Sequence, residues 1–167
     1  MSKKISLTNN FFKDFEKGLY CLKIQDEKLT EFKYDDIKEF SEGLACARLN
    51  HKYGYLDEHG DEIIPIKFDD AGPFKEGLAS VKIDGKLCFI DKSGKETISI
   101  MYDNVWNFCN GLARVELNGL YGYIDKSGKE VIPIIYDEAK DFEGEKAQTM
   151  YKNQLGQVNK QNYWRNY

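Results

Sequence analysis

Two histidines, four cysteines and a recurring set of aspartates are the side chains of this 167-residue chain that could do chemistry. His51 and His59 flank a short predicted strand and could form a two-histidine metal pair, but both fall in predicted turns and no further ligand lies at a zinc-site spacing. The aspartates would form a metal or acid site only if they converged on one cleft. The sequence contains no P-loop, no G-x-G-x-x-G and no H-E-x-x-H motif. We therefore expect no catalytic residue, no metal ligand and no cofactor.

The cysteines are spread along the chain at Cys21, Cys46, Cys88 and Cys109, without a C-x-x-C pair. Their even number would permit two disulfides, but the first fifteen residues carry no apolar stretch of the kind that directs export. We expect four small, half-buried thiols in a cytoplasmic protein. No run approaches the roughly 20 apolar residues that span a bilayer, so no membrane partner is expected.

The charge of the chain argues against one class of partner. Its formal net charge is -4 and its sequence pI is about 5.3, whereas sequence-independent binding of nucleic acid needs a basic stripe. We expect no nucleic-acid partner.

The elements that must position these side chains recur along the sequence. Phe40, Phe74, Phe108 and Phe142 follow one another at intervals of 34 residues, and each of the first three is followed by Gly-Leu-Ala, by Asp-x-x-Gly and by an aromatic-Asp pair. A fixed period of this length is typical of a repeat protein, in which each unit buries its apolar face against its neighbours. We divide the chain into an N-terminal segment that leads into the repeats and caps them, residues 1–14, and one repeat domain, residues 15–167. The units of this domain are 15–39, which is truncated, then 40–73, 74–107 and 108–141, and finally 142–167, which is degenerate and forms a cap.

Within a unit the apolar residues alternate with polar ones, which predicts half-buried β-strands. Residues 113–117 (ARVEL) end at Asn118-Gly119, a dipeptide that favours a tight hairpin turn, and the chain returns as LYGYID. In this second strand Gly122 lies between two tyrosines, so we expect a neighbouring backbone or a large side chain to pack closely against it.

Two further features predict turns and edges. The Asp-x-x-Gly segments, which begin at Asp57, Asp91 and Asp125, fit a type I turn whose last residue is left-handed; in the degenerate copy Asn162 takes the place of glycine. Pro65 and Pro133 cannot donate a hydrogen bond to a neighbouring strand, so the third segment of a unit should be an edge or a bulge.

Unit 108–141 contains the pattern G-L-A-x-V-x-x-N-G-x-x-G-Y-I-D-x-S-G-K-E-x-I-P-x-x-Y-D, and the two full units before it keep many of its positions. This pattern resembles the WG repeat of bacterial proteins, also called the KWG-type repeat, over residues 40 to 141, with weaker copies on both sides. No copy contains the Trp-Gly pair of that family; the corresponding pairs are Tyr53-Gly54, Leu87-Cys88 and Tyr121-Gly122. The resemblance implies an interaction module that brings no catalytic residues.

Two architectures fit an all-β protein of this kind. The first is an open, solenoid-like stack of antiparallel β-hairpins, favoured because the shortened units at both ends look like caps. The second is a small closed ring, similar to a propeller, in which the incomplete first and last units together make one blade.

Comparing the copies with one another identifies candidate partner-binding residues. Trp106 occupies a position that holds Gly72, Lys38 or Lys140 in other copies, which predicts a partly exposed aromatic anchor; alternatively, Trp106 covers Ser99. The second candidate is the C-terminal segment, which either binds a partner or closes the last sheet edge. Its candidate residues are Tyr163, Trp164 and Arg165.

Three classes of function remain. We predict a non-catalytic protein-protein interaction module, such as an accessory subunit or an immunity-type binding protein, whose partner is another protein. The alternative is a repeat protein that binds a small ligand such as choline or a glycan. An enzyme is the least favoured class, because it would need a pocket built from residues present in one copy only.

Overall fold

The fold is described from a computed structural model of the 167-residue chain. The structure describes residues 4–8, 11–14, 18–24, 27–28, 33–99, 102–162 and 164–166. Every regular element in these ranges is a β-strand, and they contain no helix able to cross a membrane. The chain divides into two compact units, which are described separately: Met1–Pro73 with Val81–Gly85, and Phe74–Ser80 with Lys86–Tyr167.

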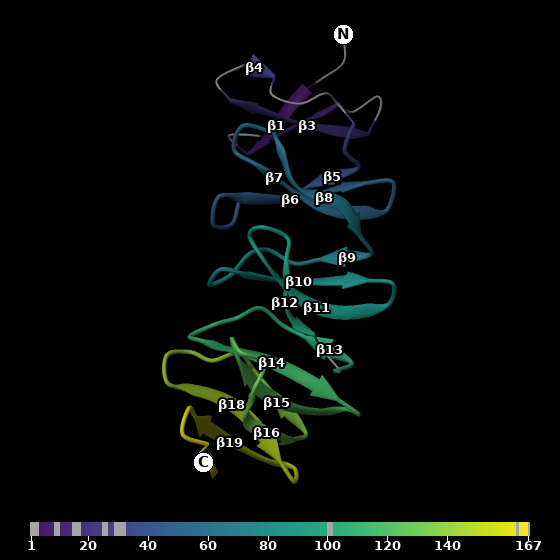
Figure 1. The fold of residues 1–167 in the computed structure, drawn as a ribbon. Coiled ribbons are helices and arrows are strands. Elements are labelled where there is room, and N and C mark those ends of the chain that lie inside the picture. Colours follow the sequence, from purple (N-terminus) through teal and green to yellow (C-terminus); the bar gives the residue numbers. More distant parts are fainter. Residues whose placement is uncertain are drawn as a thin grey trace. The chain divides into compact units, whose positions relative to one another are not determined.

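The described strands form five antiparallel sheets of four strands each, and none of these sheets closes into a barrel (Figure 1). The first sheet contains β1 (Lys4–Thr8), β2 (Phe11–Asp14), β3 (Leu19–Ile24) and β4 (Glu27–Lys28). The second contains β5 (Asp36–Ile37), β6 (Leu44–Leu49), β7 (Lys52–Asp57) and β8 (Glu62–Phe68). The third contains β9 (Asp70–Ala71), β10 (Leu78–Ile83), β11 (Lys86–Asp91) and β12 (Glu96–Ser99). The fourth contains β13 (Asn104–Val105), β14 (Leu112–Leu117), β15 (Leu120–Asp125) and β16 (Glu130–Tyr136). The fifth contains β17 (Glu138–Ala139), β18 (Lys146–Tyr151), β19 (Gln154–Asn159) and β20 (Trp164–Asn166).

The prediction of an all-β repeat protein is confirmed. Each of the four later sheets begins directly after an aromatic-Asp pair, so its short first strand comes from the end of the preceding sequence unit. The predicted cap segment, residues 1–14, contains β1 and β2, which pair with each other, and β2 pairs with β3. The boundaries of the sequence units, and the choice between an open stack and a ring, stay predictions.

The central hairpin of the fourth sheet is closed by the tight turn that the sequence predicts. In the fourth sheet β14 pairs with β15 from Leu112 opposite Asp125 to Leu117 opposite Leu120, and Asn118 and Gly119 between them both have positive φ, 53° and 78°. The backbone N–H of Asn118 donates to the carboxylate of Asp103 at 2.7 Å. At three other turns the second turn residue donates instead: the acceptors are Asp35, Asp69 and Asp137, and the donors are the backbone N–H groups of His51, Gly85 and Asn153. The aspartate of each aromatic-Asp pair therefore fixes the hairpin turn that follows it in the sequence.

The Asp-x-x-Gly aspartates are confirmed as turn formers. Oδ1 of Asp125 accepts the backbone N–H groups of Ser127 and Lys129 at 2.8 and 3.1 Å, and the Ser127 hydroxyl donates to it at 2.6 Å. Asp57 and Asp91 bind the corresponding N–H groups of their own turns. The fourth residue of each turn has positive φ, and the residues concerned are Gly60, Gly94, Gly128 and Asn162.

These turns should make the free energy of unfolding depend on pH. The hydrogen bond from the Ser127 hydroxyl, followed by the two backbone N–H groups, holds the pKa of Asp125 below its ordinary value. The stabilising contribution is therefore fully present above the unfolded-state pKa of about 3.9 and is lost as pH falls through the folded-state pKa. We expect Asp125→Asn to flatten the fall in stability below about pH 4. Urea unfolding between about pH 3 and pH 6 measures this slope, and a slope equal to that of the wild type would contradict the assignment.

The close approach to Gly122 and the edge position of the proline segment are also confirmed, and they have one cause. In the pairing of β15 with β16, Tyr121 lies opposite Tyr136 and Tyr123 opposite Ile132, so the edge strand carries extra residues, Pro133 among them, in a bulge. A Cβ atom on Gly122 would lie 2.7 Å from the carbonyl oxygen of Ile132.

The second and third sheets show whether the glycine and the proline occur together. In the second sheet, a Cβ atom on Gly54 would meet the Ile64 carbonyl oxygen at 2.6 Å beside Pro65. In the third sheet, which has no proline in its last strand, Cys88 lies directly opposite Ser99. In these three sheets the glycine therefore accompanies the proline bulge, whereas in the fifth sheet Gly156 lies beneath the ring of Trp164.

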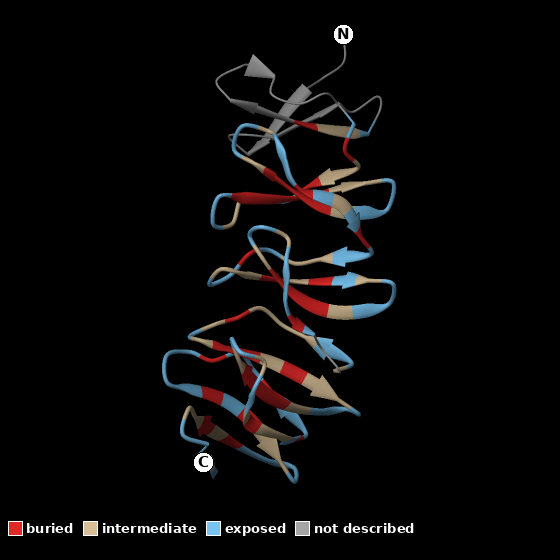
Figure 2. Ribbon diagram, in the orientation of Figure 1, coloured by how far each residue is buried: buried red, intermediate tan, exposed pale blue. Residues whose placement is uncertain are grey.

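Buried aromatic residues join successive sheets of the C-terminal unit, and Figure 2 shows the buried positions concentrated in the strands. The ring centroids of Phe89 and Phe108 are 4.8 Å apart, and those of Tyr123 and Phe142 are 4.9 Å apart. The Tyr123 hydroxyl also donates to the Lys140 carbonyl at 2.6 Å. Phe108 and Phe142 thus fill the contacts between successive sheets of this unit. The four cysteines are free thiols; Cys109 is half-buried and the other three are buried.

Candidate binding surface

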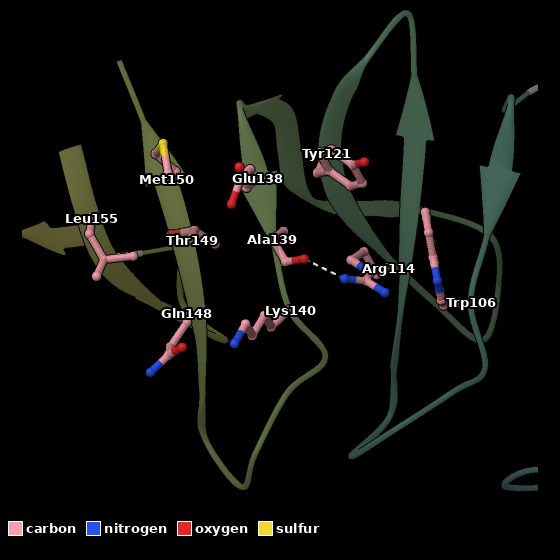
Figure 3. Close-up of a pocket in the computed structure, with 10 residues that line it drawn as sticks. All are labelled: Trp106, Arg114, Tyr121, Glu138, Ala139, Lys140, Gln148, Thr149, Met150 and Leu155. Carbon is pink, nitrogen blue, oxygen red and sulfur yellow. Dashed lines mark hydrogen bonds between the residues drawn. The ribbon is translucent and has the colours of Figure 1, made fainter. Parts of the chain in front are cut away.

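A groove of about 370 Å³ lies in the C-terminal unit, where β14 and β15 of the fourth sheet meet β17 and β18 of the fifth (Figure 3). We call it the Trp106 groove. Its lining residues are Trp106, Arg114, Tyr121, Glu138, Ala139, Lys140, Gln148, Thr149, Met150 and Leu155.

Arg114 is held against three partners in this groove. Its guanidinium carbon lies 4.0 Å from the centroid of the Trp106 ring, and Nη1 donates to the carbonyl oxygen of Ala139. Its Nε lies 3.4 Å from a carboxylate oxygen of Asp141. Only 15% of the Arg114 side chain is exposed. Arg114 therefore connects the fourth sheet to the edge of the fifth and fixes the ring of Trp106.

Sequence reasoning missed Arg114, although the sequence carries a signal for it. The residues at the same position of the other copies are Cys46, Ser80 and Gln148, so arginine is an exception in the same way as Trp106. Cys46 repeats the contact in weaker form, because its sulfur lies 3.8 Å from the Ala71 carbonyl oxygen. Burial raises the pKa of the Cys46 thiol to about 12, so the sulfur stays neutral there.

The rest of the groove is mainly apolar. The Tyr121 ring lies 5.8 Å from that of Trp106, and Leu155 is 54% exposed. Thr149 is buried, and its hydroxyl has no hydrogen-bond partner among the residues described. The groove thus combines aromatic and aliphatic walls with one buried hydroxyl and the charged residues Arg114, Lys140 and Glu138.

The predicted partner-binding residues do not share one cavity. Trp106 is half-buried in the groove, against Arg114 and Tyr121. Trp164 is half-buried in the last sheet, where its ring lies 5.8 Å from that of Tyr151 and directly over Gly156. Arg165 is exposed and lines a second cavity. Tyr163 lies outside the residues that the structure describes.

The histidines are held in or beside turns. The backbone N–H of His51 donates to the Asp35 carboxylate at 3.5 Å, and Nδ1 of His59 lies 3.6 Å from the Asp57 carboxylate. Both side chains are exposed. Across the described ranges, no three histidine, cysteine, aspartate or glutamate residues are grouped so that they could hold a metal ion.

Comparison with known proteins identifies the repeat. The profile of the WG containing repeat matches residues 23–53, 53–86, 89–121 and 121–164, which together make up most of the chain. No curated protein gives a significant match.

Among solved structures, the chain is similar to the extracellular domain of a protein described as a one component system of B. thetaiotaomicron, with 11% sequence identity and a TM-score of 0.43. The match covers 94% of this chain and 28% of that structure, so the chain spans less than a third of its length. That domain is described as extracellular, contrary to the cytoplasmic location predicted from the sequence, and we withdraw this prediction without assigning another location. The fold prediction and the family resemblance are confirmed by the four profile matches and the five similar sheets: the chain belongs to the WG repeat family.

Proposed function

We propose that this WG-repeat chain is a non-catalytic protein-binding module and that the Trp106 groove is its recognition surface. The observation that carries the proposal is the pairing of Trp106 with Arg114 beside the exposed Leu155. Tryptophan, tyrosine and arginine dominate the binding energy of protein interfaces, above all where neighbouring residues exclude water around them. An accessory subunit or an immunity-type binding protein would use such a surface.

The chemistry of the groove favours a protein over choline or a glycan. Choline is bound through the open faces of aromatic rings, but one face of Trp106 already carries the Arg114 guanidinium. This fixed positive charge would repel a quaternary ammonium, and it would cover the platform on which a sugar ring stacks.

The recurring acids support a binding role over a catalytic one. The carboxylates of Asp57, Asp91 and Asp125 accept hydrogen bonds from N–H groups of their own turns. Those of Asp103 and Asp137 accept hydrogen bonds from the hairpin turns. Each of these carboxylates is committed to shaping the backbone.

Replacing Trp106 by alanine tests the proposal. Partners captured from a lysate of the native cells are identified first, and the affinity of each is then measured with purified protein. We expect Trp106→Ala to weaken binding by about 2 kcal/mol, or roughly thirtyfold, because it removes the anchor and releases Arg114. Ile135→Ala is the matched control, since Ile135 is an exposed apolar residue outside the groove lining. Wild-type affinity of Trp106→Ala for every partner would rule the groove out.

A further inference from the structure

A second cavity of about 370 Å³ lies on the last sheet, separate from the lining of the Trp106 groove. We call it the Arg165 pocket, and its lining residues are Lys146, Gln157, Val158, Asn159 and Arg165. These residues come from the adjacent strands β18, β19 and β20.

The register of the strands places the four polar residues on one side of the sheet. Lys146 lies directly opposite Asn159, and Gln157 lies directly opposite Arg165. Directly opposite residues of an antiparallel pair point to the same face, and residues two apart on one strand do so as well. Gln157 and Asn159 are two apart on β19, so all four side chains share a face.

The preceding repeats show what this face normally carries. In the register of the fourth sheet, Leu112 lies opposite Asp125 and Tyr123 lies opposite Ile132, so these four residues occupy the equivalent places. In the fourth sheet Leu112 and Tyr123 are buried in a core shared with Phe142 and Ala147 of the fifth sheet. At the same positions the last sheet carries lysine, glutamine, asparagine and arginine.

These replacements change the charge in one direction. Lys146 replaces a leucine, Arg165 an isoleucine and Asn159 an aspartate, so the pocket gains two cations and loses one anion relative to the repeat before it. An uncovered sheet face needs polar side chains, but it does not need the loss of a carboxylate. The change also opposes the chain as a whole, which has a formal net charge of -4.

Asn159 keeps the turn-forming role of the aspartate that it replaces, but it carries no charge. Oδ1 of Asn159 accepts the backbone N–H of Gln161 at 3.1 Å, and Asn162 completes the turn with positive φ. The turn therefore gives no reason for the exchange of aspartate for asparagine, since three other copies build it with aspartate.

The two cations of the pocket are not neutralised by ion pairs within the described part of the chain. Lys146 and Gln157 also line an adjoining cavity whose lining includes the acids Asp141 and Glu143. Glu145 is paired with Lys160 at 2.8 Å. Arginine offers a planar fork and lysine a compact charge, and both suit phosphate or carboxylate oxygens.

We propose that the Arg165 pocket binds a small molecule through an oxyanion group, a phosphate or a carboxylate. Arg165 and Lys146 supply the positive charge, and the amide group of Gln157 supplies further hydrogen-bond donors. The cavity is at the small end of the range for ligand sites and exceeds what a single inorganic anion fills.

Calorimetric titration with inorganic phosphate, pyrophosphate and citrate tests the proposal and separates phosphate from carboxylate ligands. We expect at least one probe to bind with a dissociation constant at or below about 1 mM, more weakly as salt rises. Restoring the residues of the preceding repeat should lower the affinity about tenfold for each of Lys146→Leu, Asn159→Asp and Arg165→Ile.

Asn159→Asp is the decisive variant, because the aspartates of other repeats form the same turn and the fold should be unharmed, as urea unfolding would verify. Lys129→Leu makes the same charge change as Lys146→Leu at an exposed residue outside the pocket and should bind like the wild type. Trp106→Ala should also bind like the wild type, so this proposal and that of the protein-binding groove fail independently. The proposal is overturned if none of the three probes binds, or if Asn159→Asp and Arg165→Ile bind as tightly as the wild type.

Discussion

Gly122→Ala should destabilise the C-terminal unit by about 3 kcal/mol, the upper end of what overpacking a core usually costs. An added Cβ atom would lie 2.7 Å from the Ile132 carbonyl oxygen and 2.8 Å from the Ile134 Cα atom. Both are backbone atoms of the proline bulge, so no side-chain rotation relieves the contact. The edge strand β16 would have to move away, which would also disturb Ile132 and Tyr136 in the core.

The third sheet provides the control for this substitution. Cys88 occupies the equivalent position opposite Ser99 and is buried, so this sheet already accommodates a Cβ atom there. Cys88→Ala should cost only about 1 kcal/mol, because it removes one buried sulfur without adding a clash. Urea unfolding of both variants gives the comparison. Equal losses for the two variants would show that the bulge does not determine the need for glycine.

The features that the sequence predicts well depend on the chemistry of a few neighbouring residues. Asn118-Gly119 adopts positive φ at both positions, and the Asp125 turn closes through its own N–H groups. The edge position and bulge at Pro133 follow from a missing N–H group, and the close contact at Gly122 follows from a missing side chain. Each depends on the chemistry of one residue, so it can be read without knowing how the sheets are placed.

The features that the sequence does not reveal depend on contacts across sheets. The hydrogen bond from Asn118 to Asp103 joins residues of two different sequence units, and the aspartate alone suggests only a local cap. Arg114 reaches Ala139 and Asp141 because the edge of the next sheet lies beside β14. Neither contact follows from propensity or periodicity, since both require the distance between successive sheets.

The Trp106 groove and the Arg165 pocket also differ in how far the sequence reveals them. Comparing copies at one position identifies Trp106, and the same comparison at its neighbours would have added Arg114. The Arg165 pocket needs more, because Lys146, Asn159 and Arg165 are separated in the sequence and only the register of β18, β19 and β20 brings them to one face. Asn159 by itself predicts only a turn.

Phe142→Ala should cost about 3 to 5 kcal/mol, the range for removing a buried aromatic side chain and leaving a cavity. Phe142 is 2% exposed, and its ring meets that of Tyr123 edge-on at 4.9 Å. It packs in one cluster with Ala147 and Val158 of the last sheet and Leu112 of the sheet before it. The substitution would therefore weaken the packing contact between the fourth and fifth sheets.

Because each unit of a repeat protein is stabilised mainly by its neighbours, the last sheet should open before the rest of the chain does. In Phe142→Ala we expect hydrogen exchange of the amides in β18 and β19 to accelerate strongly, while exchange in β6 and β7 of the other unit changes little. Ile135→Ala, at a residue that is 44% exposed, should shift stability by less than about 0.5 kcal/mol and leave exchange unchanged. If Phe142→Ala instead accelerated exchange equally in β6, β7, β18 and β19, the chain would unfold as one cooperative block, and the contact between the last two sheets would not be a separate determinant of stability.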